Sequence, residues 1–463
     1  MAEKQKQKKP RERDSVSLIH ALTRGSWPTK TTALISGFGC LIYGQFARGL
    51  LYLAVQILTL AGFISFGWQY VRDFATLGTR EMTSVLDPIY QIPINVPGDN
   101  SLQILLYSVF AFALLAAGLA VHLSAVKAAY AAETLIRSGK RPAGFRQDLR
   151  DLLDKNVHTT MLSLPVLGVA AFTALPIIFM ILLAFTNFDR LHQPPGNLFT
   201  WVGMQNFTDM LSLNGVLGNT FIRILGWTLI WAVFATFLNY FFGMIVALMI
   251  NKQGIRLKSL WRTCFVIAIA VPGFVTLLFM RQLLGDLGPI NTLLQSDFMR
   301  ALGFSPVQFL RDPGIARVTV IVVNLWIGIP YTMLITSGIL MNIPADLFEA
   351  ARIDGAGPVR QFRSITLPYM LAVTAPYLIT QFIGNINNFN AIFFLTGGGP
   401  PSVDYYHAGK TDLLVTWLYS LTVTRGDYNL ASVIGIITFL LSAAMGLIAF
   451  NITASAKKEE TFR

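Results

Sequence analysis

The stretch Glu349–Pro368, EAARIDGAGPVRQFRSITLP, lies between two long apolar segments of the chain. Pro344 stands before it at a predicted helix start, where the missing N–H of proline costs nothing. Asp354 and Gly355 predict the end of that helix. A second short segment then returns through Leu367 to apolar sequence. The stretch therefore predicts a helix–turn–helix elbow that joins two apolar helices.

The composition places those apolar helices in a membrane. The 463 residues are 54% hydrophobic and 13% charged, with a mean hydropathy of +0.55, whereas soluble domains carry about 25% charged residues. Eight apolar segments are long enough to cross about 30 Å of hydrocarbon at about 1.5 Å per residue. They cover about 48–70, 102–123, 159–186, 222–250, 262–284, 317–340, 368–395 and 429–453. We predict an all-α polytopic membrane protein with eight transmembrane helices.

Three smaller features lie outside the eight predicted spans or concern single residues. Residues 31–46, TTALISGFGCLIYGQF, are apolar but interrupted by glycines, and we predict an interfacial or re-entrant segment. Cys40 and Cys264 lie far apart in apolar sequence, which favours packing residues over a disulfide or a metal site. The loop 124–158 contains DLRDLLDKN, which could form a short amphipathic helix, but a solvated connector is the favoured interpretation.

The distribution of Lys and Arg orients the predicted spans. The loops at 187–221 and 396–428 are poor in positive charge, and four other polar segments are rich in it. The rich set comprises Lys4, Lys6, Lys8, Lys9, Arg11 and Arg13 of the N-terminal tail, the loops 124–158 and 251–262, and Lys457 and Lys458. Because positive charge collects on the cytoplasmic side, we predict cytoplasmic termini and a cytoplasmic elbow at 341–367. The net charge of +12 then reflects topology and does not indicate nucleic-acid binding.

The elbow also contains a spaced motif. Glu349-Ala350-Ala351 is followed after three residues by Gly355, after nine more by Ile365, and after one more by Leu367-Pro368. This spacing matches the EAA loop of binding-protein-dependent ABC importer permeases, a family that the chain resembles. The resemblance implies that these seven residues couple the membrane helices to a nucleotide-binding subunit. The chain has no G-x-x-x-x-G-K-[ST] motif, so ATP hydrolysis is expected in separate subunits and not in this chain.

The resemblance extends to sugar importer permeases of the maltose/maltodextrin (MalF) type. The order of the eight spans and Gly397-Gly398-Gly399-Pro400 carry it, and it implies a six-helix, MetI-like core. The loop between the third and fourth spans is short, as in Gram-positive versions. We divide the chain into a tail and interfacial segment (1–47), three spans (48–218), the core (219–453, with the coupling loop at 341–368) and a tail (454–463).

The resemblance also implies partners. They are a second homologous permease subunit of the MalG type, two ATPase subunits, an extracellular sugar-binding protein, membrane lipid and an oligosaccharide. It implies no cofactor, no metal and no catalytic residue, and a place in the bacterial plasma membrane.

The seventh predicted span contains a polar stripe. At 100° per residue, Tyr377, Gln381, Asn385 and Asn388 share one face of a helix, and Thr374 extends it. Amides and a phenol suit the hydroxyls of a neutral sugar, but hydrogen bonds between helices are the alternative. The resemblance favours sugar contact and adds two residues of WIGIPY in the sixth span, Gly328 and Tyr331.

The sequence does not decide which sugar is transported. Ile269 and Gly273 flank Ala270-Val271-Pro272 where the maltose type has Tyr and Ser, and Gln381 replaces a Ser. Maltodextrin is the first expectation, with a galactoside or a cyclodextrin as alternatives. An ion-coupled secondary transporter is the rival class, but it predicts an intramembrane acidic residue, and a membrane enzyme predicts a catalytic cluster. Neither pattern is found in the sequence.

Overall fold

The structure is a computed structural model that describes residues 17–252 and 254–452. The two terminal tails used in the topology prediction therefore lie mostly outside the described residues. The chain divides into two compact units, Met1–Leu182 with Leu191–Trp201 and Leu183–Arg190 with Val202–Arg463. The boundary predicted at 218 falls inside the second unit, and the division predicted from sequence stays a prediction.

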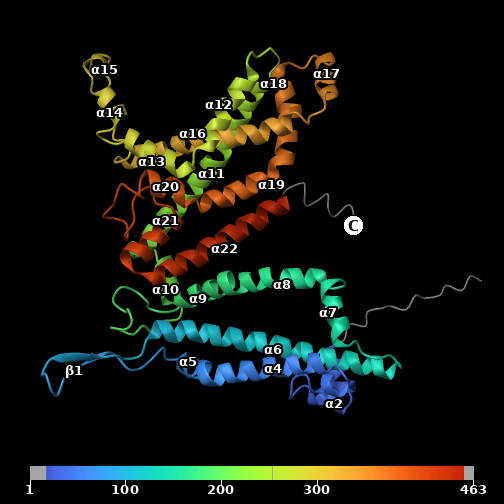
Figure 1. The fold of residues 1–463 in the computed structure, drawn as a ribbon. Helices are drawn as coiled ribbons and strands as arrows, with labels where there is room; N and C mark the ends of the chain where they lie inside the picture. Colours follow the sequence, from blue (N-terminus) through green and yellow to red (C-terminus); the bar gives the residue numbers. More distant parts are fainter. Residues whose placement is uncertain (1–16, 253, 453–463) are drawn as a thin grey trace, which may run out of the picture. The chain divides into compact units, whose positions relative to one another are not determined.

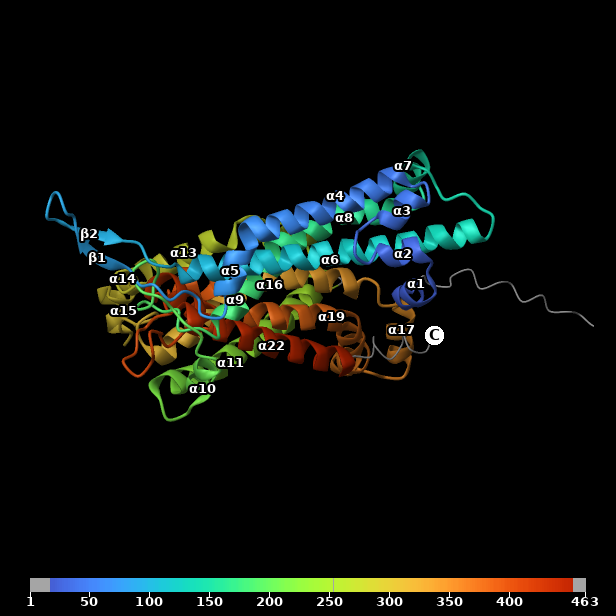
Figure 2. The same cartoon turned by 90° about the horizontal axis from the view of Figure 1, so that it is seen from below.

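The first unit is helical apart from one β-hairpin. Its elements are α1 (Leu18–Arg24), α2 (Trp27–Thr31), α3 (Phe38–Ile42), α4 (Phe46–Gly62), η1 (Phe63–Gly67), α5 (Trp68–Asp73), β1 (Thr83–Leu86), β2 (Pro93–Val96), α6 (Ser101–Arg137), α7 (Phe145–Leu153), α8 (Val157–Val169), η2 (Ala170–Ala174) and α9 (Leu175–Leu183). The strands pair antiparallel, with Thr83 opposite Val96. Figures 1 and 2 both show α4 and α6 side by side, with the hairpin at one end and α1–α3 at the other.

Small residues let α4 and α6 approach closely. A Cβ at Gly118 would lie 2.5 Å from Thr59 Cγ2, and the hydroxyls of Tyr52 and Ser124 lie 3.3 Å apart. Such small-residue contacts are typical of helix packing in membranes, where lipid tails compete equally for apolar side chains.

Three predicted features are corrected or refined by the structure. The favoured interpretation of 124–158 as a connector is wrong, because α6 continues to Arg137 and α7 forms the amphipathic helix. Arg48 holds α7 through Asp148 at 2.5 Å. Residues 31–46 form only the five-residue α3 and turns, so they do not cross as a helix. Cys40 is buried, Cys264 is exposed, and both are free.

The second unit is built around α11. Its elements are α10 (Gln205–Leu211), α11 (Val216–Asn251), α12 (Lys258–Ala270), α13 (Gly273–Leu283), α14 (Pro289–Leu294), α15 (Asp297–Ala301), α16 (Pro313–Leu340), α17 (Ala345–Ile353), α18 (Pro358–Gln361), η3 (Phe362–Thr366), α19 (Leu367–Ile386), α20 (Phe389–Leu395), α21 (Leu414–Tyr419), η4 (Ser420–Arg425) and α22 (Tyr428–Ile452). Both α16 and α19 pack on α11. Figures 1 and 2 show α17 and α18 at one end of α16 and α14 and α15 at the other.

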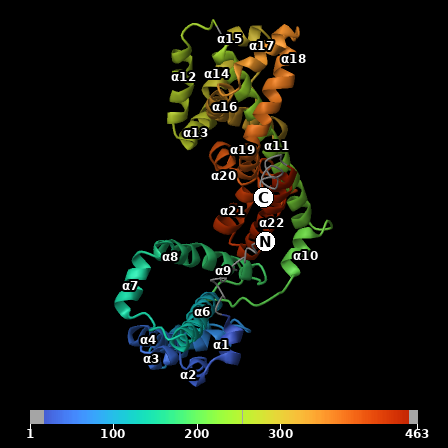
Figure 3. The same cartoon turned by 90° about the vertical axis from the view of Figure 1, so that its right-hand side faces the viewer.

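The described residues contain seven helices long and apolar enough to span a membrane, or eight if one bent pair counts as a span. This confirms the all-α polytopic class. The fifth predicted span, 262–284, is not straight, because α12 and α13 meet at 90°, as Figure 3 shows. Val271 ends α12 in an extended conformation (φ −78°, ψ 125°), which is the conformation that a following proline favours.

The seventh predicted span is also broken. α19 ends at Ile386 and α20 begins at Phe389. Asn388 caps α20, because its side-chain oxygen accepts a hydrogen bond from the N–H of Ala391 at 3.2 Å. Asparagine is among the strongest N-cap residues. Treating 368–395 as one continuous helix was therefore wrong at Asn388.

Candidate functional site

The elbow has the predicted helix–turn–helix form, and its turn is closed by two hydrogen bonds. The N–H of Ala356 donates to the carbonyl of Ala351 at 2.8 Å, and the N–H of Gly355 donates to the carbonyl of Arg352 at 3.0 Å. This pair is a Schellman motif. Gly355 has φ +74°, a left-handed conformation that glycine adopts without steric cost. Gly355 thus sets the angle between α17 and α18.

The outer surface of the elbow is exposed and partly apolar. Glu349 and Ala350 are exposed, and Ile353 and Val359 are 87% and 79% exposed. Apolar side chains gathered at an exposed surface mark a contact with another molecule. A neighbouring groove of about 400 Å³ is lined by Leu248, Phe348, Pro358, Val359, Gln361, Phe362 and Thr366.

The inner side of the elbow is tied to the membrane helices. Leu367 and Phe362 pack against one buried cluster, and Tyr377 of the polar stripe packs against the same cluster. The cluster comprises Tyr240, Met244, Met370 and Leu378. Ile365 is half-buried, and Pro368 occupies the first turn of α19. Of the other motif residues, Ala351 is half-buried. A displacement of the elbow can therefore reach the stripe through direct contacts.

Two tyrosines from neighbouring helices form one part of the predicted sugar site. The rings of Tyr331 on α16 and Tyr377 on α19 lie 6.5 Å apart between centroids at 48°. Within the described residues, their hydroxyls and the amide of Gln381 form no hydrogen bond. These polar groups are therefore available to a ligand.

The other polar residues of the stripe are used inside the protein. Thr374 Oγ1 lies 2.8 Å from the hydroxyl of Tyr240 on α11. Asn385 Nδ2 donates to Thr236 Oγ1 at 2.9 Å, and Asn388 Nδ2 donates to Asn385 Oδ1 at 3.3 Å. The bonds of Thr374 and Asn385 join α19 to α11, as the interhelical alternative expects, whereas the bond between Asn388 and Asn385 stays within one segment. Both interpretations of the stripe thus have residues in their favour, and sugar contact at Asn385 and Asn388 stays a prediction.

Gly328 lies at a close helix crossing. A Cβ on Gly328 would come within 2.6 Å of the Asn239 side chain on α11. Thr332 Oγ1, one turn further along α16, donates to the Asn239 carbonyl at 2.9 Å. The absence of a side chain at Gly328 therefore permits α16 to pack on α11. Its predicted sugar contact remains untested.

Helix α11 contributes hydrogen-bond partners to the stripe that were not predicted from the sequence. Its buried polar residues Thr228, Thr236 and Asn239 are spaced near helical period, and that spacing was the available signal. Asn239 Oδ1 is buried without a hydrogen-bond partner in the described part of the chain. Trp231 Nε1 donates to the Asn385 carbonyl at 3.1 Å. The helix thus supplies partners to Thr374 and Asn385 of the stripe.

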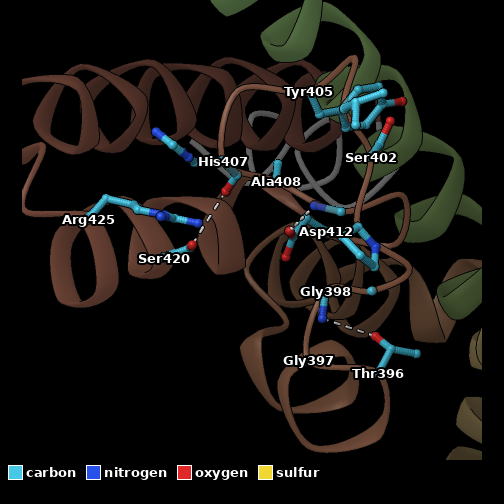
Figure 4. Close-up of a pocket in the computed structure, with 14 residues that line it drawn as sticks. Thr396, Gly397, Gly398, Ser402, Tyr405, His407, Ala408, Asp412, Ser420 and Arg425 are labelled. Carbon is cyan, nitrogen blue, oxygen red and sulfur yellow. Dashed lines mark hydrogen bonds between the residues drawn. The ribbon is translucent and has the colours of Figure 1, made fainter.

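A second pocket lies in the segment between α20 and α22, shown in Figure 4. It measures about 620 Å³ and is lined by Thr396, Gly397, Gly398, Gly399, Pro401, Ser402, Val403, Tyr405, His407, Ala408, Gly409, Asp412, Ser420 and Arg425. Asp412 is buried and accepts hydrogen bonds from the Gly409 N–H and the Thr416 hydroxyl, both at 2.8 Å. Burial raises the pKa of Asp412 to about 6. This buried carboxyl was not predicted from the sequence.

Comparison with known proteins identifies the family. Residues 239–457 match the family described as "Binding-protein-dependent transport system inner membrane component". Over 429 residues the chain is 33% identical to the galactooligosaccharides transport system permease protein GanP of Bacillus subtilis (strain 168), covering 92% of this chain and 97% of that protein. The chain belongs to the family of binding-protein-dependent importer permeases.

Further similarities agree with this family. The chain is 33% identical over 433 residues to the maltodextrin transport system permease protein MalC of Streptococcus pneumoniae (strain ATCC BAA-255 / R6), covering 92% of this chain and 95% of that protein. The crystal structure of a bacterial alginate ABC transporter with its pentasaccharide-bound periplasmic protein contains a chain of the same fold. It aligns with a TM-score of 0.53 at 20% identity over 67% of this chain and 98% of that chain.

The family confirms the predicted kind of protein. As an inner membrane component of a binding-protein-dependent system, this permease subunit is a multi-pass transport component and not an enzyme. It works together with a binding protein and other subunits.

Proposed function

We propose that this permease subunit carries a neutral oligosaccharide across the membrane in an ATP-driven importer, with maltodextrin as the first candidate cargo. The near full-length similarity to MalC and GanP is the observation that carries this proposal. A galactooligosaccharide is the second candidate, favoured by the match to 97% of GanP. Both cargoes consist of neutral sugar units, whose hydroxyls require donors and acceptors but no charge.

The proposed assembly contains a second homologous permease of the MalG type, two ATPase subunits and an extracellular sugar-binding protein. The elbow supports an ATPase contact, because Ile353 and Val359 are exposed beside a groove. Closure of the ATPase subunits would move α17, and Leu367 would pass this movement to the cluster beneath Tyr377. The docking surface would consist of Glu349, Ala350 and Ala351. Gly355 would set the angle between α17 and α18.

The proposed sugar path follows the polar stripe. Tyr331, Tyr377 and Gln381 would bind the sugar directly, since their polar groups are not used within the described residues. Gly328, Asn385 and Asn388 are proposed to shape the same wall. Alternating access would open this wall outward when the loaded binding protein docks and inward after ATP hydrolysis.

The proposed topology has both termini and the elbow in the cytoplasm. It rests on the excess of Lys and Arg in the loops 124–158 and 251–262. The elbow and the α14–α15 segment lie at opposite ends of α16 (Figure 1), which agrees with loops on opposite sides of the membrane.

Uptake by the complete importer in proteoliposomes tests the proposal. We expect uptake of maltotriose or a galactotriose that requires ATP inside and the binding protein outside. Tyr377→Phe should lower uptake about fivefold to tenfold, because one hydrogen bond to the sugar is worth about 1–1.5 kcal/mol. Thr374→Val is the matched control, since its hydroxyl already bonds Tyr240. It should lower stability and leave the preference between the two sugars unchanged.

Two outcomes would contradict the proposal. The first is uptake that follows a proton or sodium gradient and ignores ATP depletion, which would indicate a secondary transporter. The second is ATP-driven uptake of neither sugar, which would exclude the proposed cargo class while leaving the assembly intact.

A further inference from the structure

Residues 17–45 of the first unit fold against the ends of α4 and α6. Position along these two helices indicates depth in the membrane. The hydroxyls of Tyr52 and Ser124 lie 3.3 Å apart, so the two antiparallel helices are in register there. Arg48, four residues before Tyr52, then lies near the level of Lys127, three residues after Ser124. These are the nearest cations to the apolar stretches of the two helices, and they mark the edge of the hydrocarbon.

The turn of this segment, at residues 33–36, is its tip, and it lies on the hydrocarbon side of that edge. Gln56 Oε1 accepts from the Ser36 N–H at 2.6 Å, and Gln56 Nε2 donates to the Leu34 carbonyl at 3.0 Å. His122 Nε2 lies 3.1 Å from the Ala33 carbonyl. Gln56 is eight residues beyond Arg48 along the helix (56 − 48), which is about 12 Å at 1.5 Å per residue.

The two ends of the segment, near Ser26 and at Gln45, lie on the aqueous side of the edge. The Glu133 carboxylate accepts from the Ser26 N–H at 2.9 and 3.0 Å and from the Thr29 hydroxyl at 2.5 Å. Gln45 Nε2 donates to the Ala143 carbonyl at 3.2 Å. Glu133 is six residues beyond Lys127 (133 − 127), or about 9 Å. The chain therefore enters, turns and leaves on one side, as a re-entrant hairpin.

The contacts at the tip are those that lipid requires. Backbone groups without water must find partners inside the protein, and Gln56 and His122 supply them at the turn. The side chains left outside are apolar, with Leu34 78% and Ile35 46% exposed.

The mouth of the hairpin has the composition of a headgroup site. Trp27 is 67% exposed and its ring stands edge-on to Phe38 at 5.6 Å, and exposed tryptophan favours the membrane interface. Arg24 and Lys30 are exposed beside it. The sequence that precedes the hairpin adds Lys4, Lys6, Lys8, Lys9, Arg11 and Arg13. Basic clusters next to apolar anchors attract acidic phospholipids.

We propose that residues 17–45 form a lipid-binding re-entrant hairpin that holds acidic phospholipid at its mouth. Leu34 and Ile35 lie among acyl chains, and Arg24 and Lys30 bind the phosphate-bearing headgroup. The Glu133 carboxylate fixes the hairpin to α6, and this fixes the height of the two cations relative to the acyl chains. The hairpin belongs to the first unit, whereas the polar stripe and the elbow belong to the second.

Lipid-selective quenching tests the site in the complete importer. A fluorophore is attached at Leu34→Cys in a chain that also has Cys264→Ser, since Cys40 is buried. The protein is placed in vesicles in which either phosphatidylglycerol or phosphatidylcholine is brominated, at equal mole fraction. We expect quenching by brominated lipid and none by aqueous iodide. Brominated phosphatidylglycerol should quench at least about fivefold more, because each basic side chain contributes about 1 kcal/mol of attraction.

A charge-neutralised hairpin separates headgroup binding from insertion. Arg24→Gln with Lys30→Gln should remove most of the phosphatidylglycerol preference while lipid quenching remains. Lys252→Gln with Arg256→Gln in the second unit is the matched control and should leave the preference unchanged. Quenching by iodide, protection from both quenchers, or equal quenching by the two lipids would each overturn the proposal.

Discussion

Gly355 is the residue at which the elbow most depends on backbone conformation. Its φ of +74° costs an alanine about 1 kcal/mol or more, although no atom would obstruct the new Cβ. Gly355→Ala should therefore change the angle between α17 and α18 and lower ATP-driven uptake about fivefold, while the amount of protein in the membrane stays similar. Uptake per transporter in proteoliposomes measures this effect.

Gly357 is the matched control for Gly355. It lies two residues further on, also has open space around it, and has φ −68°, which alanine adopts readily. Gly357→Ala should therefore leave uptake near the wild-type rate. Equal losses in the two variants would show that the left-handed turn is not what the elbow requires.

Asp412 gives the protein a pH dependence of known sign. Burial raises the pKa of this carboxyl from an ordinary 3.8 to about 6, so the folded state binds the proton more tightly than the unfolded state. The stabilisation from this group is complete below about pH 4 and is lost as the pH rises through about 6. The loss is of the order of 2–3 kcal/mol.

Asp412→Asn isolates this contribution. The amide keeps an acceptor for the Gly409 N–H and can donate to the Thr416 hydroxyl, but it does not ionise. Relative to wild type, the variant should gain stability between about pH 4 and about pH 7. Thermal unfolding in detergent at several pH values measures the difference, and a difference that does not change with pH would contradict the assignment.

At the scale of elements, α11 and α16 cross closely within the second unit. A Cβ on Gly243 would lie 2.2 Å from Thr332 Oγ1 and 3.0 Å from the Met333 nitrogen. Gly243→Ala should therefore push the helices apart and destabilise the protein by about 1–3 kcal/mol. Thermal unfolding of the purified subunit in detergent measures this loss.

Gly226 on the same helix provides a control with the opposite sign. Nothing lies within 4 Å of a Cβ at Gly226, so Gly226→Ala should stabilise the helix by up to about 1 kcal/mol through its better helix propensity. If both variants were stabilised, the close crossing of α11 and α16 would not exist in the folded protein.

The sequence could predict the spans but not their interruptions. Apolar length identified each span, because only about 20 apolar residues satisfy a bilayer crossing. Proline alone could not identify the bend, since Pro330 and Pro376 lie inside continuous helices while Pro272 stands at the bend between α12 and α13. Asn388 had the chemistry of a cap, but the polar stripe continued through it, and a continuous helix was the simpler prediction.

The sequence also could not predict which residues of the polar stripe form hydrogen bonds within the protein. Tyr377 and Thr374 lie on one face of α19, yet only Thr374 is hydrogen-bonded to Tyr240. Which residues are used depends on the register of α11 against α19, and this register follows from side-chain packing and not from the pattern of one helix. The coupling motif was more predictable, because its turn is local and Gly355 itself signals it.

At the scale of the whole molecule, the elbow and the polar stripe share one buried cluster. Leu367 contacts it from the elbow side, and Tyr377 contacts it from the stripe. Close-packed interiors transmit displacement because they have few voids to absorb it. Weakening this contact should therefore uncouple the two activities, so that ATP hydrolysis continues while less sugar is moved per ATP.

Leu367→Ala provides that separation. The smaller side chain leaves a gap between the elbow and the cluster, at a cost of about 2–5 kcal/mol for a buried leucine and less for this half-buried one. We expect ATP hydrolysis stimulated by the binding protein to persist, while sugar moved per ATP falls about tenfold or more if about 1.4 kcal/mol of coupling is lost. Leu371→Ala, one turn along α19 and 42% exposed, is the control and should keep the wild-type ratio. In Leu367→Ala, hydrolysis and uptake could instead fall by the same factor. That result would mean that Leu367 supports binding of the ATPase subunits and does not transmit movement, because loss of a transmitting contact lowers uptake and leaves hydrolysis intact.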